Sequence, residues 1–411
     1  MATAAPPVRP DAARTTPRAP RRTGLLLALA IAQTVVGGTT FPAVAVLLTP
    51  ISEALDATRA QVMGASTAAL LAGALVAVPV GRLLDRHGGR AVMTTGAAAV
   101  ALLLTACAGA HDLPQLYLGF LLLGGAQASI GFESTYAVVV STLGPRQRDR
   151  GLLIISTVTG LGTTLFYPVT VWLEDGLGWR GALLALAALQ AAVSVPLLAL
   201  NLPGRSTHRR RIAQRRGMDV AAALRTPSFW LLTLCFVGQA GAGSTLSLLS
   251  VSWFLDLGHP AAVAAVLPIT LGVLQVLSRL ALVPLAPLVG MPTLAVCANV
   301  VQAAAMVSLP FTGTSIGPTM LCLAGAGLGM GVGALARPSV IASTYGAVRF
   351  ATILGLMTIA MSASRALFPL LGATLDADHA MLLCAILSAV GALSLFPVAR
   401  AARTRGEYES S

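Results

Sequence analysis

The sequence predicts an all-α integral membrane protein with twelve transmembrane helices in two pseudo-symmetric halves of six. Of the 411 residues, 56% are hydrophobic and only 10% are charged, whereas a soluble domain carries about 25% charged residues. Apolar runs of roughly 20 residues, the length that crosses a bilayer core about 30 Å thick, recur along the chain. Backbone groups in lipid must be paired internally, and the runs are long rather than short and alternating, so each is expected to be a helix.

The hydrophobic runs set the expected order of elements. The predicted spans are approximately 24–49, 60–81, 91–110, 114–142, 151–173, 181–202, 228–253, 261–289, 292–310, 316–344, 350–373 and 380–399. A signal peptide is the weaker interpretation of the first run, which is longer than a signal core. The expected units are a basic tail, a six-helix bundle, a basic linker, a second six-helix bundle and a second tail, at residues 1–23, 24–202, 203–226, 227–400 and 401–411.

The positions of the arginines orient the predicted helices. All 27 basic residues are Arg, and we count 22 in the tails and alternate connections, two in the remaining connections and three inside apolar runs. The positive-inside bias therefore places both termini in the cytoplasm and the chain, as a multi-pass protein, in the cell inner (plasma) membrane. The net charge of +12 is explained by this bias, so no nucleic-acid partner is expected. The five cysteines and five histidines show no metal-ligand spacing, and no cofactor is expected.

A short motif joins the predicted second and third spans. It reads G-R-L-L-D-R-H-G-G-R over residues 81–90 and resembles the signature loop of the major facilitator superfamily, G-x-L-x-D-R-x-G-R-R/K. The family's functional positions fall on Gly81, Asp85, Arg86, Gly88 and Arg90, whereas Gly89 departs from the usual Arg. The resemblance implies the major facilitator fold and a gating role for these five residues.

Elementary chemistry agrees with a gating role for this loop. Gly81 permits two helices to approach closely, and the Asp85 carboxylate can accept charge-assisted hydrogen bonds from a neighbouring helix end or an Arg. A solvated turn is the alternative interpretation. The corresponding stretch of the second half, residues 283–292, carries no charge and has Pro287 in the place of Asp85. A latch built on this motif is therefore expected on one side only.

Shorter segments are similar to monocarboxylate and oxalate/formate-type carriers of the same superfamily. These are P-S-F-W-L-L at residues 227–232 and a Gly/Pro pattern over 160–180. Such carriers also place an Asp four residues before an Arg in the eighth span, where the Arg holds a substrate carboxylate. Here Arg279 keeps the Arg position, but Gln275 replaces the Asp. The resemblance thus implies Arg279 as the anion ligand and leaves the family's proton mechanism in doubt.

Charged groups inside the apolar runs are the main functional candidates. An ionisable group at the bilayer centre costs at least about 2.5–3.5 kcal/mol, so Glu133, Arg279, Arg337 and Arg365 should face the interior of the bundle. Glu133 and Arg337 are expected to pair as a relay, a gate or a static brace, and a structural pair between Glu133 and Arg279 is the alternative. Substrate contact is predicted for Arg279, Gln275, Arg337, Tyr136 and Gln239, and coupling or gating for Glu133 and Arg365.

These residues predict a secondary transporter rather than an enzyme. The expected substrate is a small organic anion, with monocarboxylates as the first class, moved by alternating access, with protons as the candidate coupling ion. The chain is expected to act as a monomer in contact with membrane lipid. An exporter of a hydrophobic, antibiotic-like compound is the second hypothesis, and a non-transporting membrane sensor is the third.

Overall fold

The computed structural model describes residues 22–208, 217–282 and 285–410, and these residues are helical apart from short connections and one isolated bridge. Most of the predicted tail 1–23 and the central part of the predicted linker lie outside the described residues. The helices of the first half are α1 Arg22–Ala54, α2 Arg59–His87, α3 Gly89–Ala108, α4 Leu113–Ala128, α5 Phe132–Thr142, α6 Pro145–Leu189, the π-helical η1 Gln190–Ser194 and α7 Val195–Asn201.

The second half is also built of helices joined by short connections. Its helices are α9 Val220–Leu224, α10 Pro227–Asp256, α11 Ala261–Leu282, α12 Ala286–Val289, α13 Met291–Ser308, the 3₁₀ helix η3 Leu309–Thr312, α14 Ile316–Tyr345, α15 Phe350–Ala373 and α16 Ala377–Ser410.

Within the described residues, eleven helices are long and apolar enough to cross a membrane. One of them, Gln147–Asn201, has 55 residues and would be about 80 Å long if straight, more than twice a bilayer core of about 30 Å. Gly178 interrupts it with a φ of 67° and a ψ of 171°, values in a region that glycine adopts readily. This helix therefore contains the fifth and sixth of the twelve predicted spans, and the predicted all-α membrane fold is confirmed.

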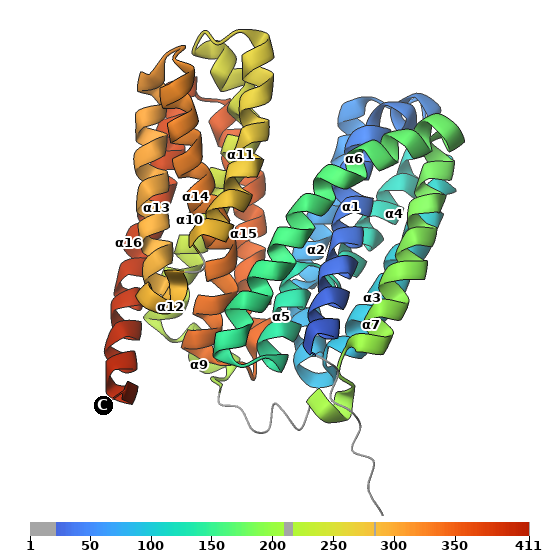
Figure 1. Ribbon diagram of the computed structural model, residues 1–411. Coiled ribbons are helices and arrows are strands. Elements are labelled where there is room, and N and C mark those ends of the chain that lie inside the picture. The colour runs from blue at the N-terminus through green and yellow to red at the C-terminus, as the bar shows by residue number, and fades with distance from the viewer. Residues whose placement is uncertain (1–21, 209–216, 283–284, 411) are drawn as a thin grey trace, which may run out of the picture.

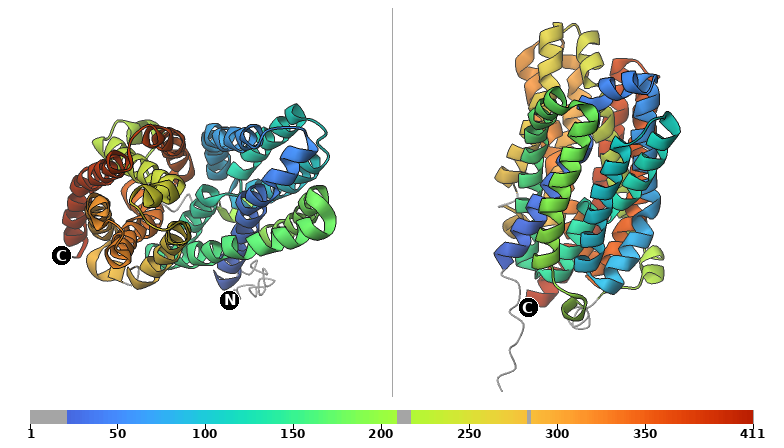
Figure 2. Two further views of the ribbon diagram at one scale, coloured as in Figure 1. Left: turned by 90° about the horizontal axis from the view of Figure 1, so that it is seen from above. Right: turned by 90° about the vertical axis from the view of Figure 1, so that its right-hand side faces the viewer.

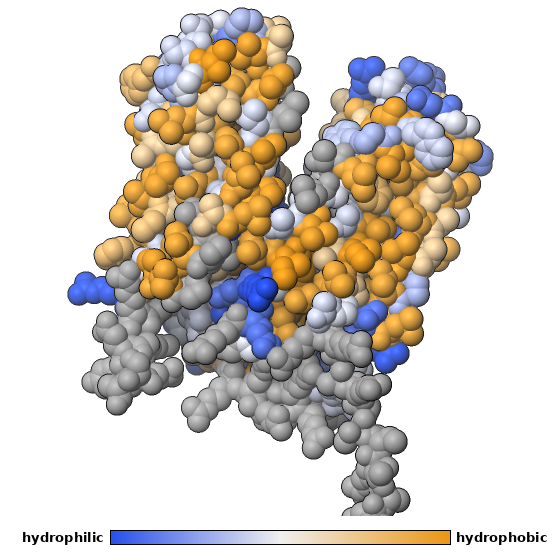
Figure 3. Space-filling model, viewed as in Figure 1, coloured by the Kyte–Doolittle hydropathy of each residue, from blue (hydrophilic) through white to orange (hydrophobic). Residues whose placement is uncertain are grey.

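The helices form two bundles that stand side by side (Figures 1 and 2). The start of α1 and the end of α16 lie at the same end of the molecule, which we call the terminal end. On the face seen in Figure 3, hydrophobic side chains cover the middle of both bundles, and hydrophilic side chains gather toward the two ends. In the same view the bundles stand apart toward the end opposite the termini. The molecule thus has an apolar belt and a division between its halves that opens in one direction.

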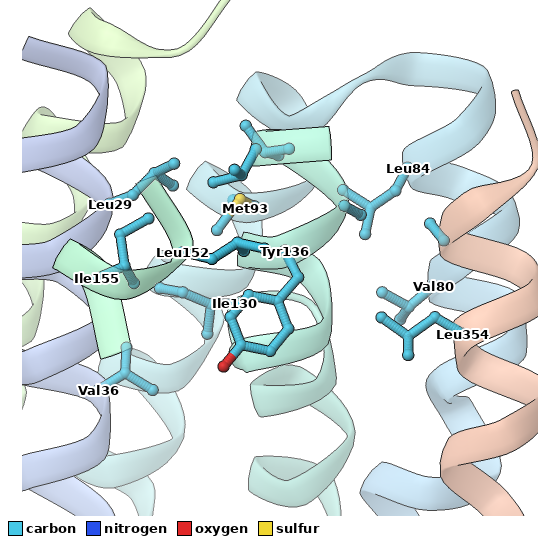
Figure 4. Packing of buried hydrophobic residues seen from close by; sticks show 14 of the residues in the cluster. Leu29, Val36, Val80, Leu84, Met93, Ile130, Tyr136, Leu152, Ile155 and Leu354 are labelled. Atoms are coloured by element: carbon cyan, nitrogen blue, oxygen red, sulfur yellow. The ribbon is translucent and has the colours of Figure 1, made fainter. Parts of the chain in front are cut away.

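The two halves pack closely where α2 meets α15. A Cβ added to Gly81 would lie 2.5 Å from the Ala351 carbonyl oxygen, and one added to Gly355 would lie 2.7 Å from the Ala77 carbonyl oxygen. Figure 4 shows Val80 of α2 beside Leu354 of α15, and both side chains are buried. Small residues therefore let the two backbones approach to contact distance, which is how helices associate in lipid.

Candidate functional site

A cavity of about 290 Å³ lies among α10, α11, α14 and α15 of the second half. The described side chains and backbone that line it come from Phe236, Gln239, Ala240, Gly243, Ser244, Ser247, Gln275, Arg279, Met330, Gly333, Ala334, Arg337, Met361 and Arg365. Three arginines separated by up to 86 positions in the chain thus meet at one cavity. No acidic residue stands among these lining residues, so the wall of the cavity is strongly positive.

Arg337 joins the two halves through an ion pair. Its Nη2 donates to Oε1 of Glu133 at 3.5 Å, and its Nη1 approaches the Met361 sulfur at 3.3 Å. Arg337 itself is buried, with 7% of its surface exposed, and its Nε has no hydrogen-bond partner among the described residues. Glu133 belongs to α5 and Arg337 to α14, so the pair connects the first half to the cavity of the second.

Glu133 stands at a break in the fourth span. We expected one continuous helix over 114–142, but α4 ends at Ala128 and α5 begins at Phe132 after Gly131. Glu133 therefore lies in the first turn of α5, where unpaired backbone N–H groups favour a carboxylate by about 0.3–1 kcal/mol. The nearby Ser134 hydroxyl donates to the Ala128 carbonyl at 2.7 Å, which satisfies one of the carbonyls freed by the break. The hydropathy pattern gave no signal for this break.

Arg279 contacts backbone rather than a carboxylate. Its Nε donates to the Gly331 carbonyl at 3.1 Å, and its Nη1 donates to the Ser156 carbonyl of α6 at 3.4 Å. The second of these bonds crosses between the halves. Among the described residues Glu133 is paired with Arg337, so the alternative structural pair between Glu133 and Arg279 is not the one formed here.

The remaining predicted cavity residues differ in their contacts. Gln239 donates to the Gly329 carbonyl at 3.0 Å, and Gln275 approaches the Met330 sulfur at 3.7 Å. Arg365 lines the cavity from α15. Tyr136 is 2% exposed in the core of the first half and is not among the residues lining the cavity (Figure 4).

Asp85 caps a helix of the opposite half. Its Oδ1 accepts from the Ala351 N–H at 3.2 Å, and its Oδ2 accepts from the Thr352 N–H at 3.0 Å and the Thr352 hydroxyl at 2.6 Å. These donors belong to the first turn of α15, where backbone N–H groups have no partner within the helix. The carboxylate at the end of α2 therefore ties the two halves together at the terminal end.

Other residues of the same loop have different surroundings. Gly88 links α2 to α3 with a φ of 80°, a left-handed conformation that favours glycine, and an added Cβ would meet the His208 ring. The buried His208 makes a hydrogen bond through Nε2 to the Asp85 carbonyl at 3.2 Å. Arg86 and Arg90 are exposed, and in the described part of the chain neither makes a hydrogen bond or ion pair.

A further polar contact between the halves, also at the terminal end, was not predicted from the sequence. Asp149 of α6 accepts from the Ser339 hydroxyl of α14 at 2.8 Å, and Arg148 donates to the same hydroxyl at 3.2 Å. Arg148 and Asp149 also contact each other at 3.2 Å. From the sequence, Arg148 was counted only among the arginines that orient the helices. No sequence feature linked it to Ser339, which lies 191 positions away.

Helices long enough to cross a membrane, arranged as two bundles with a charged cavity in the second, are the architecture of a multi-pass membrane transporter. The model of the Major Facilitator Superfamily matches residues 25–315. Because that is more than half of the sequence, the chain belongs to the Major Facilitator Superfamily.

Curated relatives support the predicted resemblance over part of the chain. Monocarboxylate transporter 11 of Homo sapiens is 36% identical over 145 residues, which cover 34% of this chain and 30% of that protein. Monocarboxylate transporter 13 of Bos taurus is 35% identical over 112 residues, which cover 27% of this chain and 26% of that protein. The matched region thus spans less than a third of either relative.

Solved structures share the fold over nearly the whole chain. A Major Facilitator Superfamily transporter, FucP, in the outward conformation gives a TM-score of 0.70 at 17% identity, covering 93% of this chain and 99% of FucP. The human organic anion transporter MFSD10 (TETRAN) gives 0.71 at 17% identity, covering 92% of this chain and 100% of that one. At these identities the similarity shows the fold alone.

Proposed function

We propose that this transporter moves a small organic anion, with monocarboxylates as the first class to test. The observation that carries this proposal is the charge of the cavity, which brings together Arg279, Arg337 and Arg365 beside a single carboxylate, that of Glu133. Two positive charges therefore remain without an acidic partner among the described residues. A planar guanidinium binds a carboxylate through two parallel hydrogen bonds, and low polarity around the pair strengthens it.

The proposed binding residues form one wall of the cavity. Arg279 and Arg337 supply charge, and Gln239 and Gln275 supply neutral hydrogen-bonding groups beside them. Tyr136 would act from behind this wall, since it is buried in the first half and does not line the cavity. The names of the relatives, monocarboxylate transporters and an organic anion transporter, agree with an anionic substrate.

The way the halves meet supports the proposal of transport by alternating access. At the terminal end the Asp85 and Asp149 contacts hold the halves together, whereas the halves diverge toward the other end (Figure 3). If the termini face the cytoplasm of the cell membrane, as the arginine distribution predicts, this arrangement is the outward-open state. Substrate would then enter from outside, and the opposite state would require both contacts to break. A monomer suffices for this cycle, with lipid around its apolar belt.

Glu133 is the proposed proton-coupling group. Neutralising it would remove the partner of Arg337, and a buried charge without its partner is unfavourable. Protonation would thus release Arg337 toward the substrate. We expect Glu133→Gln to abolish the dependence of flux on a proton gradient. Transport in Glu133→Gln that keeps its full proton dependence would exclude this role.

The central test is counterflow of radiolabelled carboxylates in proteoliposomes. We expect the wild type to exchange at least one carboxylate, and Arg279→Ala and Arg337→Ala each to reduce that exchange. Arg82→Gln is the matched control, because Arg82 is exposed outside the cavity and makes no hydrogen bond or ion pair among the described residues. Wild-type protein that exchanges no carboxylate yet confers resistance to a hydrophobic compound would replace the proposal with the exporter hypothesis. Wild-type protein that transports neither would favour the sensor hypothesis.

A further inference from the structure

The three cavity arginines differ in how many of their hydrogen-bond donors are already used. A guanidinium carries five N–H donors. Arg337 directs one toward Glu133 and one toward the Met361 sulfur. Arg279 directs one to the Gly331 carbonyl and one to the Ser156 carbonyl. Each of these two arginines therefore has two of its five donors engaged by the protein and three left for an incoming anion.

Arg365 has no such partner. Within the described residues its guanidinium makes no hydrogen bond and no ion pair, although it lines the same cavity and is largely shielded from solvent. Arg337 lines the same cavity, and the carboxylate of Glu133 is already paired with Arg337. Of the three cavity arginines, Arg365 is thus the one whose guanidinium has the most N–H donors without a partner among the described residues.

The backbone that carries Arg365 is fixed in place. The neighbouring Ser364 is buried, and its hydroxyl donates to the Val237 carbonyl of α10 at 2.7 Å. One turn further along, Phe368 packs against Gly241 of α10, where an added Cβ would lie 2.5 Å from the ring. These contacts hold α15 against α10 on either side of Arg365. The backbone at Arg365 is thus already ordered, so only the rotamers of its side chain remain to be fixed when the substrate binds.

We propose that Arg365, rather than Arg279, is the primary ligand of the substrate carboxylate. This assignment rests on the proposed function and specifies which residue anchors the anion. The carboxylate takes a position against Arg365, where it replaces no protein acceptor. Gln239, which lines the same cavity from α10, lies on the helix that braces Arg365. Arg279 then acts mainly as a positioning residue, because its bond to the Ser156 carbonyl spans the two halves.

The test is equilibrium binding of a radiolabelled carboxylate, chosen as one that the wild type exchanges, to the purified full chain. We expect Arg365→Gln to weaken binding by roughly 10- to 100-fold, because it removes a charge-assisted pair. Arg365→Lys, which keeps the charge but loses the planar fork, should fall between Arg365→Gln and the wild type. Arg279→Gln should weaken binding by less than Arg365→Gln, and Arg82→Gln should leave it unchanged. A wild-type level of binding in Arg365→Gln together with lost binding in Arg279→Gln overturns the assignment.

A measurement on the wild type keeps the test independent of variant folding. An arginine-specific dicarbonyl reagent modifies accessible guanidinium groups, and peptide mass spectrometry reports each site separately. We expect the carboxylate to protect Arg365 more strongly than Arg279, whereas the neutral amide of the same acid protects neither. Protection of Arg279 alone overturns the assignment but leaves the proposed function standing. A wild type that binds no carboxylate overturns the proposed function itself.

Discussion

The two polar contacts that join the halves at the terminal end are built differently. In the first, Asp85 of α2 accepts two backbone N–H groups and one hydroxyl from the start of α15. In the second, Asp149 of α6 accepts the Ser339 hydroxyl of α14, and Arg148 supports it. Each contact places a carboxylate of the first half against donors of the second. They differ in that the donors to Asp85 are mostly fixed by a helix, whereas those to Asp149 are side chains.

This difference sets the expected strength of each contact. Backbone N–H groups at a helix start are already oriented and unpaired, so a carboxylate gains them without ordering any side chain. Side-chain donors must give up rotamer freedom to bind. We therefore expect the contact at Asp85 to stabilise the closed state of the terminal end more than the contact at Ser339 does. The following substitutions test this ranking, from the largest expected effect to the smallest.

Removing the carboxylate at Asp85 should have the largest effect. Asp85→Ala takes away the acceptor of three hydrogen bonds, and bonds to a charged group contribute about 1.5–3 kcal/mol. We expect the population closed at the terminal end to fall at least tenfold, measured as a longer distance between spin labels at the exposed positions Arg86 and Arg225. The control is Asp112→Ala, because Asp112 caps α4 within one half through the Gln115 N–H. An unchanged distance distribution in Asp85→Ala would contradict the ranking.

A methyl group at Gly81 should have the next largest effect. In Gly81→Ala the new Cβ would lie 2.5 Å from the Ala351 carbonyl oxygen and 2.9 Å from the Thr352 Cα, and neither backbone atom can rotate away. Overpacking of this kind costs about 1–3 kcal/mol. The same label pair should report partial opening. Gly176→Ala is the control, since no atom lies within 4 Å of its added Cβ, and opening of equal size in that variant would refute the steric explanation.

Loss of the hydroxyl at Ser339 should have the smallest effect of the three. Ser339→Ala removes the donor to Asp149 and the acceptor of Arg148, but Arg148 and Asp149 still contact each other at 3.2 Å, so neither charge loses its only partner. We expect a small shift toward the open state, measured as a slight increase in the distance between the spin labels at Arg86 and Arg225. Ser343→Ala on the same helix is the control, because the Ser343 hydroxyl donates within its own helix to Val340. A shift larger than that of Asp85→Ala would reverse the ranking.

The sequence was most informative where a single physical demand dominates. Lipid requires long apolar helices, and hydropathy alone located the spans, including the two that are separated by the non-helical Gly178. The loop motif likewise directed attention to Asp85. The sequence did not predict the break before Glu133, because a short non-helical turn leaves the hydropathy of 114–142 unchanged. Nor did it predict the contact between Asp149 and Ser339, whose side chains are ordinary polar groups until folding brings them together.

The sequence by itself determined that this chain is a helical membrane protein, through its composition and the order of its apolar and basic segments. It also determined which residues would be costly to bury. Those properties depend on transfer between water and lipid, which each segment undergoes largely by itself. Only the tertiary structure decided which of the buried charges find partners. Arg337 pairs with Glu133, Arg279 bonds two carbonyls, and Arg365 is left facing the cavity. Hydrogen bonds depend on distances of about 3 Å and on direction, and helices far apart in sequence acquire those only when they pack.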